Sequence, residues 1–243
     1  LAHGKFQSKI SNETNANDTH RRLLISAPVI AATVAVVNLA SSISGTIYNY
    51  GVAIQIDNWY KSTDLSLERY YLADGYQTNA AKPTIAAATK DTAGAYSDYS
   101  AWAGAHGWDD ASAGVVRYKI ITTKYTQCMD IMWSQSYFQQ KCTSGGLDVP
   151  GGCQYWSGFG IGISSGRCDK SLENAFNEFE TKVEAVNFAW EDATDGPIQT
   201  GDYKFQSRVY EYPMYYDNDD INVKATMADA SKGDMIVEVR PTL

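Results

Sequence analysis

The sequence lacks the motifs that identify most enzymes. Its only histidines are His3, His20 and His106, so a Ser-His-Asp arrangement has little to draw on. It contains no G-x-S-x-G, phosphate-binding loop, dinucleotide fingerprint or H-E-x-x-H. A glycosidase remains open, because its two carboxylates can come from anywhere in a chain. Because the other catalytic motifs are missing, we expect a protein that is not an enzyme and uses no cofactor.

Clustered positive charge is also missing. The formal net charge is −8, and the longest basic run is Arg21-Arg22. Proteins that bind nucleic acids need grouped Lys and Arg to neutralise phosphates, so we expect no nucleic-acid partner. The arginine pair is either a processing site of a secreted protein or two surface residues.

Cysteine is confined to one part of the chain. The four cysteines are Cys128, Cys142, Cys153 and Cys168. Their even number predicts two local disulfides in an oxidising compartment, with three pairings open. Zinc is the rival, but the chain has no C-x-x-C pair and no histidine near these cysteines. We expect no metal; the acidic cluster at 217–220 is typical of solvated surface, with calcium binding as its alternative.

Residues 1–21 form a polar arm with signs of secretion. Asn12 and Asn17 each begin a glycosylation sequon. The chain starts at Leu1 without Met, which is consistent with a mature protein whose signal peptide was removed. We expect the protein to be extracellular.

From Leu23 to Ile56 the chain has no charged residue, although 20% of the whole sequence is charged. Ser26-Ala27-Pro28 is a helix start, a hydroxyl side chain followed closely by proline. Apolar residues then recur at steps of three and four, as on one stripe of a helix. They are Val29, Ala32, Val36, Leu39, Ile43 and Ile47. We expect a helix over 26–45 that can insert into a membrane, then a buried strand over 52–56.

Three interpretations of this helix remain open. A permanent transmembrane helix needs about 20 strongly apolar residues, and this segment is diluted by Ser, Thr, Asn and Pro28. The second is a helix buried against its own sheet. The third is a helix that packs on the domain in water and can leave it for a bilayer. Its weak polarity suits this role, because the energy of packing on the domain must be small enough to be exchanged for contact with lipid.

The rest of the chain predicts mostly strands. Alternating or apolar stretches are expected to form strands near 65–72, 115–122, 125–138, 221–227 and 235–240. The last two predict a terminal hairpin. The glycine-rich stretch 141–167 predicts a pair of loops pinned by disulfides.

A second helix is expected over 170–190, where Leu172, Phe176 and Phe179 share one face. Two helices among many short strands predict a mainly β fold, a β-sandwich flanked by two α-helices with an N-terminal polar arm. We assign the arm to residues 1–21 and a single domain to residues 22–243.

Aromatic residues supply the candidate contacts with lipid or another ligand. Tyr (17 residues) and Trp (6 residues) are abundant, and their amphipathic rings suit membrane interfaces and binding surfaces. The candidates are Trp133, Tyr137, Phe138, Tyr155 and Trp156. Packing within the sandwich is the alternative for each of them.

Four stretches resemble the actinoporin-like pore-forming proteins. Tyr50–Asn58 is similar to the family's helix-to-strand junction, which ends in an Asp-Asn turn. Leu67–Lys90 resembles the strand pair that follows, Gly114–Tyr118 the central strand, and Val223–Val239 the terminal hairpin. The resemblance implies a secreted β-sandwich that binds lipid, oligomerises and inserts its N-terminal helix to form a pore.

The chain departs from this family where the ligand would bind. Members usually lack cysteine and are often basic, whereas this chain has four cysteines and is acidic. Their phosphocholine pocket uses tyrosines on the second helix, where this sequence has Phe176, Phe179, Glu180 and Thr181. The differences affect sphingomyelin recognition more than the fold.

We expect a secreted, membrane-binding protein that associates with itself and forms pores. A self-assembling extracellular structural or storage protein on the same fold is the alternative, and a carbohydrate-binding module is a third class. The candidate partners are therefore a lipid membrane, a glycan and further copies of this chain.

Overall fold

The computed structural model describes residues 51–88, 94–104, 111–139, 155–188, 198–206, 213–227 and 232–242. The chain divides into two compact units, residues 1–35 and 36–243, and every described residue belongs to the second. The polar arm, its sequons at Asn12 and Asn17, and the helix expected over 26–45 lie outside the described residues.

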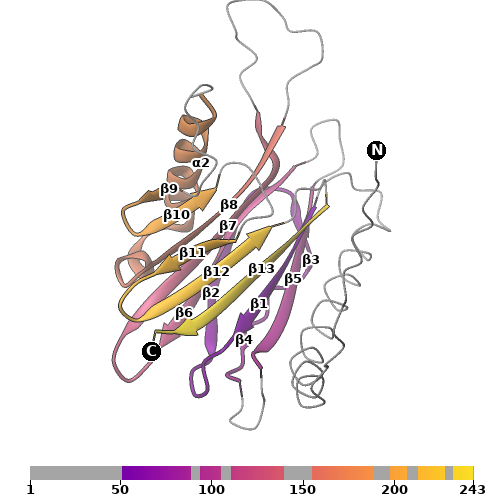
Figure 1. Ribbon diagram of the computed structural model, residues 1–243. Helices are drawn as coiled ribbons and strands as arrows, with labels where there is room; N and C mark the ends of the chain where they lie inside the picture. The colour runs from indigo at the N-terminus through magenta and orange to yellow at the C-terminus, as the bar shows by residue number, and fades with distance from the viewer. Residues whose placement is uncertain are drawn as a thin grey trace, which may run out of the picture. The chain divides into compact units, whose positions relative to one another are not determined.

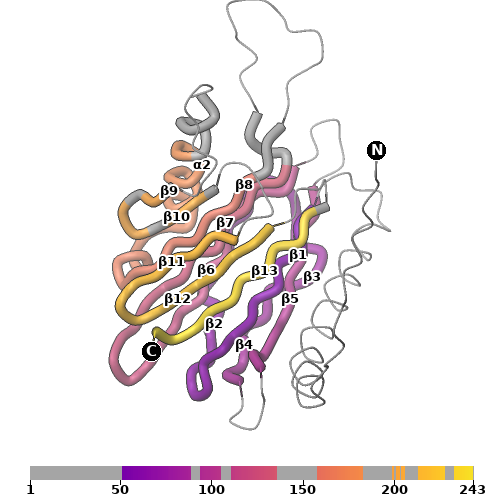
Figure 2. The backbone as a smooth tube through the Cα atoms, in the orientation of Figure 1, coloured from indigo at the N-terminus to yellow at the C-terminus, as the bar shows by residue number. Residues whose placement is uncertain are grey.

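The first of two sheets has six strands in the order β11-β12-β13-β1-β5-β3 (Figure 1). They are β1 (Gly51–Asn58), β3 (Tyr76–Asn79), β5 (Tyr96–Ala103), β11 (Met214–Asp217), β12 (Ile221–Met227) and β13 (Lys232–Pro241). Figure 2 shows indigo β1 and yellow β13 side by side in the middle of this sheet, where they run parallel. The strand predicted at 52–56 and the terminal hairpin are confirmed.

The second sheet has seven strands in the order β4-β2-β6-β7-β8-β10-β9. They are β2 (Leu65–Asp74), β4 (Thr84–Ile85), β6 (Ser112–Ile121), β7 (Thr126–Gln139), β8 (Tyr155–Ser164), β9 (Ile198–Thr200) and β10 (Tyr203–Gln206). The short helix η1 (Gly166–Asp169) and the α-helix α2 (Leu172–Phe188) follow β8. In the part of the chain that the structure describes, α2 is the one α-helix, so the fold is mainly β with two sheets, and two flanking helices are not supported.

The facing surfaces of the two sheets form the main core. Along β12, buried apolar residues alternate with partly exposed polar ones, as expected for a strand with one face inside. Trp102 of β5 and Trp133 of β7 come from different sheets, and their ring centroids lie 4.4 Å apart. Both indoles are fully buried, so this contact joins the two sheets within the main core.

Helix α2 covers the outer face of the second sheet. The Ser171 hydroxyl accepts a hydrogen bond from the backbone N–H of Asn174 at 3.1 Å, which caps the first turn. Leu172, Phe176 and Phe179 then pack in a second apolar cluster with side chains of β6, β7 and β10. β6 and β7 are thus covered on both faces, and their buried residues include the polar side chains of Arg117 and Asp130 as well as apolar ones.

Two local predictions were wrong. Asp57 and Asn58 do not form a turn but end β1, and the Asn58 amide donates hydrogen bonds to the carbonyl oxygens of Thr63 at 2.9 Å and Ile85 at 3.2 Å. These bonds tie the end of β1 to the β1–β2 connection and to β4, and Asn58 still pairs with Val239 of β13 and Tyr96 of β5.

The stretch at 141–167 is also more than a pair of loops, because it contains β8. Glycines on one face of this strand alternate with Phe159, Ile161 and Ile163, which belong to the main core. The glycine face lies under α2: a Cβ on Gly160 would lie 3.2 Å from the ring of Phe179. The glycine at position 160 of β8 therefore reflects a close approach of the helix rather than loop structure.

Candidate functional site

The structure separates Trp133 from the other predicted aromatic residues. Trp133 is fully buried in the main core, and its indole N–H donates a hydrogen bond to the Ser112 hydroxyl at 3.2 Å. It therefore packs within the fold, which was the alternative for this residue, and it cannot contact lipid in this conformation.

The other four aromatic residues come together at one end of β7 and β8. Beyond a register shift after Ser134, Phe138 is the Cα partner of Trp156 and Gln139 the partner of Tyr155, with Tyr137 beside Phe138 in the chain. We call residues 137–139 and 155–156 the aromatic ribbon. Within the described residues, β6 pairs with β7 only as far as Gln135, so the ribbon is two-stranded and continues past the sheet.

One of the two expected disulfides is present. Cys128 at the start of β7 is bonded to Cys168 in η1, across a sequence separation of 40. Cys142 and Cys153 lie outside the described residues. The bond fixes η1 against the outer face of the second sheet, directly before α2.

A buried ion-pair network lies beside this disulfide. Arg117 of β6 and Asp130 of β7 are directly paired, and the guanidinium donates to both carboxylate oxygens, at 2.5 and 2.8 Å. A third hydrogen bond joins Arg117 to the Lys170 carbonyl oxygen at 2.6 Å. Such a bidentate pair satisfies charges that would otherwise be costly to bury.

Arg167 of η1 extends the same network. It donates to Asp130 at 3.2 Å and to Asp202 at 3.0 Å, and the Ser164 hydroxyl donates to Asp202 at 2.6 Å. Its guanidinium occupies the space where Gly162 lacks a side chain. The sequence offers a signal for this network, since Arg117 and Asp130 carry opposite charges and each lies between apolar residues of a strand.

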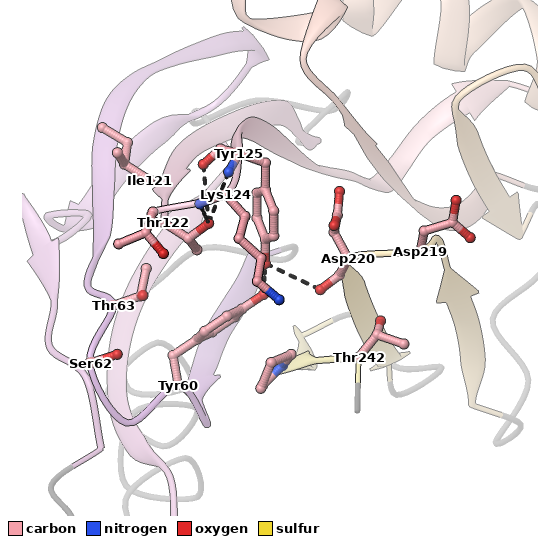
Figure 3. Close-up of a pocket in the computed structure, with 12 residues that line it drawn as sticks. Tyr60, Ser62, Thr63, Ile121, Thr122, Lys124, Tyr125, Asp219, Asp220 and Thr242 are labelled. Atoms are coloured by element: carbon pink, nitrogen blue, oxygen red, sulfur yellow. Dashed lines mark hydrogen bonds between the residues drawn. The ribbon is translucent and has the colours of Figure 1, made fainter.

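A cavity of about 540 Å³ lies where three connections and the C-terminal segment meet (Figure 3). The connections are β1–β2, β6–β7 and β11–β12. The residues around it are Tyr60, Ser62, Thr63, Ile121, Thr122, Thr123, Lys124, Tyr125, Asp219, Asp220, Pro241 and Thr242. We call it the end cavity. The predicted aromatic residues are not part of it.

Two tyrosines at the end cavity form a directed hydrogen-bond chain. The Tyr125 hydroxyl donates to the Asp220 carbonyl oxygen at 3.2 Å, so in its 2.8 Å contact with Tyr60 it accepts the proton of the Tyr60 hydroxyl. Burial raises the pKa of Tyr60, and the hydrogen bond with Tyr125 raises it further. Tyr60 therefore stays neutral at physiological pH.

The acidic side of the end cavity is held by Asn218. Its side-chain oxygen accepts the backbone N–H groups of Asp220 at 2.9 Å and Ile221 at 2.8 Å. The Asp220 carboxylate accepts a hydrogen bond from Gln127 at 2.9 Å. Asp219 is exposed. These aspartates were interpreted as solvated surface, and the sequence gives no sign that they adjoin Tyr60, because the two segments are far apart in the chain.

Lys124 lies on a tight turn opposite these acids. The Thr122 hydroxyl accepts the backbone N–H groups of Lys124 at 3.2 Å and Tyr125 at 3.1 Å. Figure 3 shows the Lys124 side chain extending toward the hydroxyls of Tyr60 and Tyr125. The end cavity thus offers ammonium and hydroxyl donors, carboxylate acceptors and the apolar side chain of Ile121, which is 58% exposed.

Comparisons with known proteins give likenesses of fold only. No protein-family model and no curated protein sequence matches this chain. Among solved structures, the lipid-binding protein Nakanori is 8% identical with a TM-score of 0.49, and the match covers 94% of this chain and 89% of Nakanori. The Xerocomus chrysenteron lectin XCL is 10% identical with a TM-score of 0.39, covering 79% of this chain and 99% of the lectin. At these values neither protein assigns a function or a site residue to this chain.

Proposed function

We propose that this chain is a secreted, actinoporin-like protein that docks on a lipid membrane through the aromatic ribbon, oligomerises there and inserts residues 26–45 to form a pore. The observation that supports docking most directly is the register of β7 and β8, which makes Phe138 and Trp156 partners beyond the end of the sheet. Two chain segments with aromatic residues thus meet on one projecting element.

The chemistry of the ribbon suits a membrane interface. Tyr137, Phe138, Tyr155 and Trp156 lie within a short two-stranded segment. Aromatic side chains at the depth of the lipid headgroups place an apolar ring in the hydrocarbon boundary and a polar edge in water. A ribbon with several such residues can reach that depth without burying charge, because no Asp, Glu, Lys or Arg occurs among residues 137–139 or 155–156.

The insertion step rests on the uncharged run that precedes β1. Residues 51–56 of this run belong to the central strand of the first sheet, so residues 23–50 are the part that remains for a membrane. Inserting this part places no ionised side chain in the hydrocarbon region, where charge is costly. None of the helices in the described part of the chain is long and apolar enough to cross a bilayer.

The edge strands of the two sheets give little support to the alternative, a self-assembling structural or storage protein. Extended assembly by edge pairing needs a long exposed edge strand. The edge strands of the described sheets are short, with four residues in β3 and β11, two in β4 and three in β9. The Cys128–Cys168 disulfide supports an oxidising compartment for either function.

Flotation and dye release from the same vesicles test the proposal. Full-length protein is mixed with dye-loaded vesicles of phosphatidylcholine, sphingomyelin and cholesterol. We expect co-flotation and release, and Phe138→Ser with Trp156→Ser should reduce binding about tenfold because interfacial aromatic contact is lost. Tyr215→Ser is the matched control, because this tyrosine is 49% exposed on a different strand. Absence of flotation with any mixture contradicts docking, and flotation without release contradicts pore formation.

A further inference from the structure

We propose that the end cavity is a binding site for a neutral carbohydrate, separate from the membrane-docking ribbon. The volume of about 540 Å³ falls within the range of about 300–1,000 Å³ that is usual for small-molecule sites. Its lining comes from three connections, each fixed by the strands that it joins, and from the C-terminal segment that follows β13.

Thr63 supplies a hydroxyl at the wall of the end cavity. Thr63 is only 7% exposed and lines the end cavity. Its backbone carbonyl accepts a hydrogen bond from Asn58, but its hydroxyl has no hydrogen-bond partner within the described residues. A hydroxyl can both donate and accept a hydrogen bond, so this one is available to a group that enters the cavity.

The other polar groups match the hydroxyls of a sugar. Ser62, Thr123 and Thr242 add side-chain hydroxyls at the rim, each of which can donate and accept. The carboxylate of Asp219 accepts hydrogen bonds only, and the ammonium of Lys124 donates only. A sugar ring presents several hydroxyls that do both, so one ring can satisfy all three kinds of group at once.

The charges favour a neutral ligand over a charged one. Lys124 makes no ion pair with any described residue, and its ammonium opposes a choline-like cation in the same space. Asp219 and Asp220 oppose an acidic sugar or a free phosphate. Ile121 and Pro241 supply apolar surface, against which the C–H face of a pyranose can pack.

The site is pre-organised, which lowers the cost of binding. Tyr60 is held on both sides: its backbone N–H donates to the Asn58 side chain at 3.0 Å, and its hydroxyl donates to Tyr125. Asp220 is held by Asn218 and Gln127. The aromatic and acidic walls therefore keep their positions without a ligand.

The end cavity and the aromatic ribbon lie at opposite ends of one strand. Tyr125 directly precedes β7, whose 14 residues end in the ribbon, so the two sites are separated by roughly 40 Å at about 3.3 Å per residue. A molecule docked through the ribbon would hold the cavity away from the bilayer. A glycan could then be bound while the protein is on a membrane.

Saturation-transfer NMR on the full chain tests the site. The probes are methyl glycosides of glucose, galactose, mannose, N-acetylglucosamine and N-acetylgalactosamine, with phosphocholine and glucuronic acid as charged comparators. We expect transfer to at least one neutral glycoside, and a dissociation constant about tenfold weaker in Thr63→Val and in Asp219→Asn, because each loses a hydrogen bond to the ligand.

The variants separate binding from folding. Because the Thr63 hydroxyl has no partner among the described residues, Thr63→Val should leave the melting temperature unchanged or raise it. Asp217→Asn is the control, an exposed carboxylate on β11 that does not line the cavity, and it should bind within twofold of wild type. The proposal is overturned if no neutral glycoside binds, if only a charged comparator binds, if both cavity variants bind normally, or if Asp217→Asn loses binding equally.

Discussion

Arg167 lies directly over Gly162, in the space that a side chain on this glycine would fill. The two residues belong to different elements, since Gly162 is the Cα partner of Asp130 in the sheet and Arg167 reaches Asp130 from η1. The missing side chain thus allows a cation to reach a fully buried carboxylate. The fold before α2 depends on this arrangement.

Gly162→Ala is therefore expected to destabilise the protein. The added methyl group must displace the Arg167 guanidinium from Asp130, and we expect a loss of about 1–3 kcal/mol in the free energy of unfolding, as for an overpacked core. Denaturant unfolding followed by circular dichroism measures this. Gly166→Ala is the matched control, because a Cβ there would have only the Ser164 hydroxyl nearby, at 3.8 Å. Equal stability of the two variants would contradict the packing described.

The Cys128–Cys168 disulfide should contribute substantially to stability. A bond that closes a loop with a sequence separation of 40 removes unfolded-state entropy equivalent to about 4 kcal/mol. The double variant Cys128→Ala/Cys168→Ala should lose roughly this amount in denaturant unfolding.

The Cys128–Cys168 bond leaves Cys142 and Cys153 as the remaining cysteines of the sequence. Peptide mapping of the wild type should therefore recover a Cys142–Cys153 linkage as the second expected disulfide. A free thiol on Cys128 in the native protein would refute the assignment.

Asp234 should make the protein less stable as the pH rises. Desolvation by burial raises its pKa to about 6, and one carboxylate oxygen has no hydrogen-bond partner within the described residues. Ionisation is therefore less favourable in the folded state than in the unfolded state, so stability from this group is present below about pH 4 and is lost as the pH rises through about 6. Asp234→Asn should raise the melting temperature at pH 7.5 by about 2–4 °C and leave it unchanged at pH 4.

Glu238 supplies a control of opposite sign on the same strand. Burial raises its pKa, but hydrogen bonds from Lys224 and Arg240 outweigh that effect and hold the pKa below its usual range. Glu238→Gln should therefore lower stability at neutral pH, and the difference should fade as the pH falls through the folded-state pKa. If Asp234→Asn and Glu238→Gln shifted stability in the same direction at pH 7.5, these assignments would be wrong.

The strands could be predicted where one face of the sheet determines the sequence pattern. β12 and β13 alternate apolar and polar residues, and the predicted hairpin is confirmed. β8 was missed because glycine replaces the outward side chains where α2 and Arg167 approach the sheet. The period of two is present in Phe159, Ile161 and Ile163, but composition alone suggested a loop.

The candidate sites depended on tertiary structure to different degrees. The aromatic ribbon was partly predictable, because Tyr137, Phe138, Tyr155 and Trp156 lie in two neighbouring segments, and only the register of β7 and β8 was needed. The end cavity was not predictable. Tyr60 and Asp220 meet only because β1 and β12 belong to one sheet while the β6–β7 turn crosses to them from the other.

The mass of the native particle, measured by light scattering in buffer and again after flotation with liposomes, tests membrane docking and pore formation most directly. We predict a small particle in buffer that floats with vesicles as a ring-sized oligomer, and Phe138→Ser with Trp156→Ser should lower the floating fraction in line with its about tenfold weaker binding. A large assembly in buffer that ignores liposomes would contradict this account. It would instead establish the self-assembling structural alternative.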